Sequence, residues 1–357
     1  MRPVFVVEPF HYQQQLRKIN AKEGKEKEKM ETIIKGHLEG IKFGALQIHG
    51  HVAVIPIIST NGSGPDYMTM KEAMEAHLLM VTEVTEGGQV PELKVINRAD
   101  KPVLLLDGEE LSGAKQNRVL NTTILLKELS ETLIPVSCTE HGRWSYRSAH
   151  FEESGHIMSA KLRRVKNASV HENLKSMHVF RSDQGAVWDE IEVQARINKV
   201  SPVTGAMKDV LEAKKEDLDA FLEHFPAITD QNGLLVLVNG EVIGLDRISK
   251  SSAFKTVHPK LIRSYVIDAL TEKPVMGKET PGKKADAFLK KILQCTEQKF
   301  DSVGYGQDYR YEGKKIVGSA LVHESTVIHM AFFQITETEK AGRMSSVSRR
   351  RAYRTNQ

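Results

Sequence analysis

Short apolar segments, separated by short polar ones, fill the chain from residue 51 to residue 138. Each segment has the length of one strand, and no long helical pattern interrupts the series. This spacing is typical of strands that pair with their neighbours in sequence, so it favours an antiparallel sheet or a sandwich-like layer. The expected strands are 51–58, 78–84, 93–96, 103–106, 119–126 and 133–138.

Helical patterns dominate after about residue 180, where Ser182 and Asp183 are suited to cap a helix. Asn239-Gly240, between two apolar runs, predicts a type I′ hairpin, and strand pairing returns near the end of the chain. The sequence therefore predicts an α+β fold, mainly an antiparallel sheet or sandwich-like layer, with several helices inserted in the second half. The expected helices are 69–77, one starting at 184, 207–225, 259–270 and 284–299, and the late strands are 315–322 and 326–333.

Charged segments at both ends bound the expected domain. Residues 1–40 form a Lys/Glu-rich extension, 41–338 a single α+β domain, and 339–357 a basic tail that we expect to be disordered. The net charge is +4, but residues 343–357 hold five arginines and no acid, so removing them leaves 4 − 5 = −1. A body so close to neutral argues against a broad nucleic-acid-binding face.

The composition is that of a globular protein, with 40% hydrophobic and 27% charged residues. No apolar stretch approaches the roughly 20 residues of a membrane helix. The amino-terminal segment lacks the apolar core and cleavage site of a secretory signal, which predicts a cytoplasmic protein. The two cysteines of the whole chain, Cys138 and Cys295, cannot form a disulfide framework, and no Cys/His spacing predicts a zinc site.

Two polar runs carry most of the residues that suit a binding or catalytic site. They read Asp107-Gly-Glu-Glu-Leu-Ser-Gly-Ala-Lys-Gln-Asn-Arg118 and Val136-Ser-Cys-Thr-Glu-His-Gly-Arg-Trp144. Carboxylates, donors and an arginine beside glycines are expected where a polar ligand meets a rigid scaffold. The expected ligand-binding residues are Gln116, Asn117, Arg118, Asn121, Arg143 and Trp144, and the candidate catalytic acids or bases are Glu109, Glu110 and Glu140.

Glu140 also has a structural interpretation. If the strand that leads into it is extended, Glu140 and Cys138 share its core face, and a buried carboxylate needs a cation or donors. Arg118 and Arg143 are the expected partners, and a clamp that ties strands together is as consistent with the sequence as a ligand contact. Cys138 is expected to be a small buried core residue rather than a catalytic thiol.

Asp107, Glu109 and Glu110 follow a strand that looks buried. Carboxylates in such a position can hold Mg²⁺, although carboxylates are also common in turns, so the cofactor stays open. Trp144 either stacks on a base or covers the edge of the sheet, whereas Trp188 is expected in the core. His141, adjacent to a carboxylate, is a weaker acid/base candidate.

The two runs, together with Asn121, resemble the signature of the ARG and rhodanese-phosphatase-superfamily-associated protein domain, where ARG means ADP-ribosylglycohydrolase. Gln184 with Trp188, the hairpin region at 233–244 and the strand at 329–332 are similar to its later pattern. The resemblance covers about residues 45–335. It implies ADP-ribose, NAD-derived or other phosphorylated nucleotides as the ligand class, and it assigns no catalytic role to any residue.

Three functions follow from this. The leading one is an α+β protein that binds, and could hydrolyse, a phosphorylated nucleotide or ADP-ribose-like ligand. The second is a non-catalytic sensor or adaptor that uses the same pocket, and the third is a structural interaction protein whose polar motifs bridge strands. The third predicts that no concave pocket joins the two runs. A thiol hydrolase centred on Cys138 is a minor fourth option.

Overall fold

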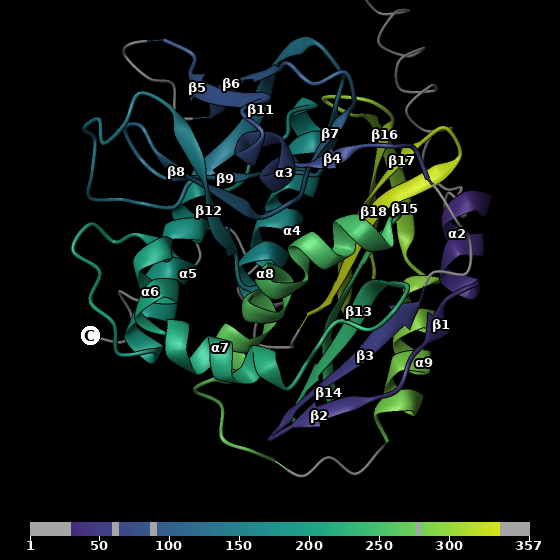
Figure 1. The fold of residues 1–357 in the computed structure, drawn as a ribbon. Coiled ribbons are helices and arrows are strands. Elements are labelled where there is room, and N and C mark those ends of the chain that lie inside the picture. The colour runs from purple at the N-terminus through teal and green to yellow at the C-terminus, as the bar shows by residue number, and fades with distance from the viewer. Residues whose placement is uncertain (1–29, 59–63, 86–90, 276–279, 336–357) are drawn as a thin grey trace, which may run out of the picture.

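The structure is a computed structural model that describes residues 30–58, 64–85, 91–275 and 280–335 (Figure 1). The expected basic tail and residues 1–29 of the expected extension lie outside the described residues. Among those described, no helix combines the length and the apolar character that a membrane crossing needs.

A nine-stranded antiparallel sheet forms the larger half of the fold. Its central hairpin turns at Asn239 and Gly240, which both have positive φ (52° and 74°), as the sequence predicts. The sheet combines strands from the first part of the described chain with strands from its last part. The order is β1 (Lys42–Phe43), β3 (Val52–Ile58), β13 (Gln231–Val238), β14 (Glu241–Ile248), β18 (Thr326–Gln334), β17 (Ile316–His323), β16 (Gln307–Glu312) and β15 (Thr296–Asp301), with β2 (Gln47–His49) paired to β3.

Helices cover both faces of this sheet, as Figure 1 shows. On the outer face lie α2 (Thr32–Glu39) and α9 (Pro281–Ile292), and on the inner face lie α4 (Ala160–Met177) and α8 (Ser251–Ala269). The other helices of the second half are α5 (Gln184–Ile197), α6 (Met207–Ala213) and α7 (Lys215–Glu223).

The strands of the first half close into a small barrel around an apolar core. Its order is β11 (Ser130–Cys138), β6 (Glu92–Asn97), β5 (Leu79–Glu83), β12 (Phe151–Ile157), β8 (Glu109–Gly113) and β9 (Arg118–Leu120). A three-stranded sheet, β10 (Ile124–Leu126), β7 (Val103–Leu105) and β4 (Met68–Thr69), lies beside it and leads into α3 (Met70–Glu75). The predicted α+β class, with mainly antiparallel sheets, is confirmed, and the strands of the first half close into a barrel.

Three helical segments differ from the prediction. The expected helix 284–299 ends at Ile292, and an edge strand, β15, follows it. The helix expected from residue 259 begins at Ser251, with Pro259 inside it, and the segment 207–225 forms two helices, α6 and α7. Helix α4 was not predicted from the sequence, because its buried face carries charged residues.

Those charged residues of α4 join the large sheet to the barrel. Arg163 donates two hydrogen bonds to the carboxylate of Asp246 in β14, at 2.6 and 2.8 Å, and Lys166 pairs with Asp107 at the start of the first polar run. Tyr265 of α8 donates a third hydrogen bond to Asp246 at 2.6 Å. Burial acts to raise the pKa of Asp246, but the charge and hydrogen bonds of Arg163 hold that pKa well below its ordinary range.

Replacing Asp246 with Asn would leave the buried guanidinium of Arg163 without its nearest counter-charge, since Asp107 lies farther away, at 3.9 Å. We expect Asp246→Asn to lower the free energy of unfolding by about 3–5 kcal/mol in urea denaturation. Asp219→Asn is the matched control, because Asp219 pairs with Arg263 at 2.7 Å but is partly exposed, so its loss should stay below about 1 kcal/mol. Equal losses in the two variants would contradict the ionic link.

Candidate functional site

The first polar run forms the hairpin of β8 and β9, and its two glutamates begin β8. Oε2 of Glu109 accepts a hydrogen bond from the backbone N–H of Leu106 at 2.8 Å, and Oε1 lies 2.6 Å from Nζ of Lys260 in α8. Gly108, before it, has a φ of +86°, and a Cβ there would lie 2.9 Å from Cγ of Arg163. The buried Glu109 thus holds α8 against the barrel, and the missing side chain at Gly108 makes room for α4.

Glu110 points to the other side of the strand and is fully buried. Its Oε1 accepts a hydrogen bond from Oγ1 of Thr139 at 2.6 Å. Burial raises the pKa of Glu110 to about 7, although hydrogen bonding by Thr139 and Ser154 and the charge of Lys208 act to lower it. A carboxyl group of this kind can gain and lose a proton near neutral pH.

Glu140 lies in a clamp of four hydrogen bonds. Its carboxylate accepts from Nε and Nη2 of Arg143 at 2.9 and 2.7 Å, from Oγ1 of Thr204 at 2.7 Å and from the backbone N–H of Asn117 at 3.1 Å. Burial acts to raise the pKa of Glu140, but these hydrogen bonds outweigh it and lower that pKa. The clamp therefore joins the first run, the second run and the segment that contains Thr204.

Arg143 completes the clamp from the other side. Its Nη1 donates to the carbonyl oxygens of Ala114 at 2.6 Å and Ser145 at 2.8 Å, and its Nη2 donates to the carbonyl of Gly113 and to Oδ1 of Asn117, each at 3.3 Å. The guanidinium of Arg143 thus donates hydrogen bonds to acceptors in the first polar run and to Glu140 in the second. Of the two arginines predicted from the sequence as partners of Glu140, Arg143 is the one that pairs with it.

Arg118 instead lies inside the end of the barrel and is fully buried. Its Nη1 donates to Gln116 at 3.1 Å, its Nη2 is 3.9 Å from Glu83, and its guanidinium is 5.7 Å from the ring centroid of Trp144. Cys138 is buried as expected, and burial raises the pKa of its thiol, which disfavours a reactive thiolate.

Asn121 faces away from the clamp. Its amide donates to the carbonyl of Phe180 at 2.9 Å, and its Oδ1 accepts from Ser137 at 2.6 Å, so it ties the barrel to the connection between α4 and α5. The structure thus brings together Gln116, Asn117, Arg118, Glu140, Arg143 and Trp144, and it places Glu109 and Asn121 elsewhere. Trp144 is 49% exposed and belongs to none of the apolar cores of the described residues.

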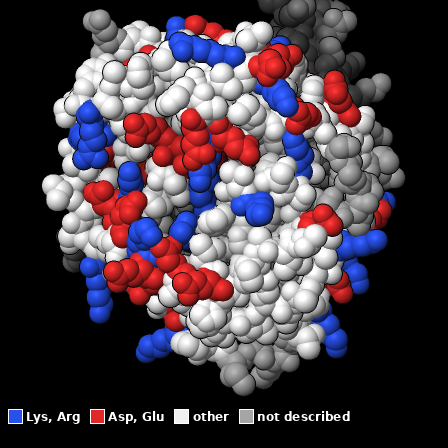
Figure 2. Space-filling model, viewed as in Figure 1, with Lys and Arg blue, Asp and Glu red and all other residues white. Residues whose placement is uncertain are grey.

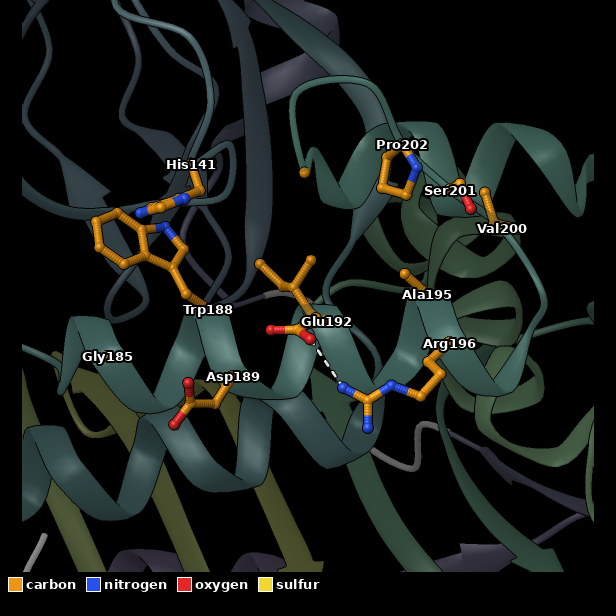
Figure 3. Close-up of a pocket in the computed structure, with 12 residues that line it drawn as sticks. His141, Gly185, Trp188, Asp189, Glu192, Ala195, Arg196, Val200, Ser201 and Pro202 are labelled. Carbon is orange, nitrogen blue, oxygen red and sulfur yellow. Dashed lines mark hydrogen bonds and ion pairs between the residues drawn. The ribbon is translucent and has the colours of Figure 1, made fainter. Parts of the chain in front are cut away.

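A pocket of about 510 Å³ lies beside the second run (Figure 3). One wall is α5, with Trp188, Asp189, Glu192 and Arg196, and the opposite wall is the segment 200–205. Of the residues in the two polar runs, His141 lines this pocket. The centroids of the His141 and Trp188 rings are 4.4 Å apart, at an interplanar angle of 69°, and Glu192 pairs with Arg196 at 2.8 Å.

The second run builds the wall of this pocket. Thr204 donates its hydroxyl proton to Glu140, and its carbonyl accepts from the N–H of Gly142 at 2.8 Å. A Cβ at Gly142 would lie only 3.1 Å from Cα of Thr204, so the close approach favours glycine there. The carbonyl of Thr139 accepts from the N–H of Met207 at 2.9 Å, where α6 begins. Thr139-Glu-His-Gly142 therefore fixes the segment 200–205 and presents His141 to the pocket.

Sequence reasoning assigned Trp188 to the core with Ile191. Ile191 is buried and Trp188 is half-buried, and both line the pocket. The available signal was the helical spacing of Trp188, Ile191, Glu192 and Ala195, which puts aromatic, apolar and acidic groups on one face of α5. No pattern in the sequence indicated that the segment 200–205 would close over that face.

Two of the three carboxylates that suggested a Mg²⁺ site have ammonium partners, and the third, Glu110, accepts a hydrogen bond from Thr139. Asp107 pairs with Lys166, and Glu109 pairs with Lys260. Within the described ranges, no group of three or more His, Cys, Asp or Glu side chains is placed to hold a metal ion. These residues, as arranged here, do not fit a divalent cation.

The raised pKa of Glu110 predicts how stability depends on pH. The folded state keeps the proton up to about pH 7, whereas an ordinary carboxyl loses it near 4.5, so this stabilising contribution is present below pH 4.5 and is lost as the pH rises through 7. The loss amounts to roughly 3 kcal/mol. Glu110→Gln should flatten this part of a denaturation profile measured from pH 4 to 8.

Glu131→Gln is the control for that profile, because Glu131 is exposed on the barrel surface, paired with Lys94. Its profile should follow that of the unchanged protein. A Glu110→Gln profile with the same slope as the control would show that the buried carboxyl does not hold its proton.

Residues 40–333 match the model of a family described as ARG and Rhodanese-Phosphatase-superfamily-associated Protein domain. The match includes both polar runs, α5 and the segment 200–205. Comparisons with curated proteins and with solved structures gave no match. Because the family match spans most of the chain, the protein belongs to the ARG and Rhodanese-Phosphatase-superfamily-associated Protein domain family.

Proposed function

We propose that the pocket on α5 binds a phosphorylated nucleotide or ADP-ribose-like ligand, with the base against the rings of Trp188 and His141. The observation that carries this proposal is the aromatic pair inside a concavity of about 510 Å³. That volume lies within the range of small-molecule sites, and aromatic rings bind nucleobases by stacking. The indole N–H of Trp188 is buried and has no hydrogen-bond partner in the described part of the chain.

The polar lining suits the rest of such a ligand. The carboxylates of Asp189 and Glu192 can accept hydrogen bonds from ribose hydroxyls. Arg196, at 70% exposure, stands at the rim, where its guanidinium can meet a phosphate. Arg118 and Arg143 were the arginines expected from the sequence to bind the ligand, but both are buried and neither lines this pocket, so we assign the phosphate to Arg196.

The charges of the pocket favour the nucleoside over the phosphate. Asp189 and Glu192 outnumber Arg196, and Arg196 is already paired with Glu192. A phosphate beside Asp189 and Glu192 would be repelled by their carboxylates, so the anionic part of the ligand should extend away from them. Phosphate should therefore add little to the affinity. We expect adenosine, AMP and ADP-ribose to bind with similar affinities, unlike in a site built around phosphate.

Trp188→Leu tests the proposal, because it keeps apolar volume and removes the stacking surface. We expect the affinity for ADP-ribose and AMP to fall at least about fivefold in isothermal titration calorimetry, since stacking of a base on a ring is worth about 1–3 kcal/mol. Trp144→Leu is the matched control outside the pocket and should leave the affinity unchanged. Equal affinities in both variants, or no binding by the unchanged protein, would refute the nucleotide proposal.

Hydrolysis of the ligand is a second candidate, and its acid/base group would have to line the pocket, as His141 does. Glu109 and Glu140 are held by cations, and Glu110, although its pKa of about 7 would suit general acid/base work, is fully buried and does not line the pocket. If His141 acts in this way, His141→Gln should slow turnover at least about 100-fold. Chromatography of the incubated ligand measures this. Binding without turnover by the unchanged protein would leave the sensor or adaptor alternative.

A further inference from the structure

Two large aromatic side chains are exposed on the connection between β11 and β12. Trp144 is 49% exposed and Tyr146 is 54% exposed. Neither belongs to an apolar core of the described residues, and exposing such rings to water is unfavourable. Aromatic residues displayed in this way are typical of protein interfaces, where tryptophan, tyrosine and arginine provide most of the binding energy.

The connection is held rigidly against the β8–β9 hairpin. Arg143 donates to the carbonyl of Ser145, and the N–H of Arg147 donates to the carbonyl of Ala114 at 2.9 Å. The N–H of Ala114 in turn donates to Oγ of Ser148 at 3.0 Å. Because the backbone beneath the rings is fixed, little conformational entropy is lost when a partner binds them.

Positive charge surrounds the two rings. Nζ of Lys115 lies 5.5 Å from the ring centroid of Trp144 and 5.0 Å from that of Tyr146. Arg147 is exposed beside them, and residues 141–151 contain no acidic residue. We call Lys115, Trp144, Tyr146 and Arg147 the aromatic–cationic surface.

We propose that the aromatic–cationic surface docks an extended acidic segment of a partner protein. Its rings would cover the apolar side chains of that segment, and Lys115 and Arg147 would pair with its carboxylates. The surface lies outside the pocket on α5, and the proposal does not depend on a ligand in that pocket.

The same observations disfavour a nucleic acid. Proteins that bind one through its phosphates typically make about 6–10 such contacts, whereas this surface offers two fixed-charge cations. The body of the chain is close to neutral, and acidic and basic side chains are intermixed on the face shown in Figure 2.

Fluorescence anisotropy of labelled peptides with the full chain tests this inference. The probes are eight-residue peptides in which Asp or Glu residues flank Leu or Phe, the same peptides with Asn or Gln in place of the acids, and an eight-nucleotide oligo(dT). We expect the acidic peptides to bind at least tenfold more tightly than the neutral ones, with an affinity that falls as salt is added. Trp144→Ala and Arg147→Glu should each weaken that binding at least tenfold.

Trp144→Phe should keep most of the affinity, and Val275→Ala, at an exposed apolar residue elsewhere, should keep all of it. An unchanged melting temperature in Trp144→Ala separates lost binding from lost folding. Trp188→Leu should still bind the peptide, so failure of the pocket proposal and failure of this one are distinguishable. Equal binding of acidic and neutral peptides, unchanged affinity in Trp144→Ala, or preference for oligo(dT) would each overturn the proposal.

Discussion

A buried carboxylate is tolerated only when donors surround it, and Glu140 meets this requirement with four hydrogen bonds. The donors come from three separate parts of the chain, so one charge fixes the hairpin of the first run, the connection after β11 and the wall of the pocket relative to one another. The residues on either side of the clamp then face outward in fixed positions. His141 lines the pocket, and Trp144 stands on the aromatic–cationic surface.

Buried charges also lie between the barrel and the large sheet, and there too each has a partner of opposite charge. Arg163 and Lys166 reach from α4 to carboxylates on both sides, where apolar side chains would be the usual packing. Such pairs add little net stability, because the desolvation of the charges offsets much of their attraction. Their main effect is to fix how the helix and the strands are aligned. Removing one partner is nevertheless costly, so the two halves of the fold are held in one relative placement.

The fold class, the antiparallel pairing, the hairpin at Asn239-Gly240 and the family could all be predicted from the sequence, because each depends on local patterns. Closure of the barrel and the position of α4 could not, since both depend on contacts between distant segments. The buried face of α4 is charged, which removes the apolar period by which helices are found. Within the site, the Arg–Glu clamp was one of two open interpretations. The choice between Arg118 and Arg143 required the barrel, which turns Arg118 inward.

The chain has two tryptophans, and each stands at one of the two candidate surfaces. Their surroundings differ: Trp188 is half-buried against an imidazole, and Trp144 is half-exposed between cations. Indole emission depends on solvent contact and on nearby charge, so the two residues form a pair of built-in optical probes. Replacing either one leaves the other as the sole source of tryptophan fluorescence, and events at the two surfaces can then be observed one at a time without an attached dye.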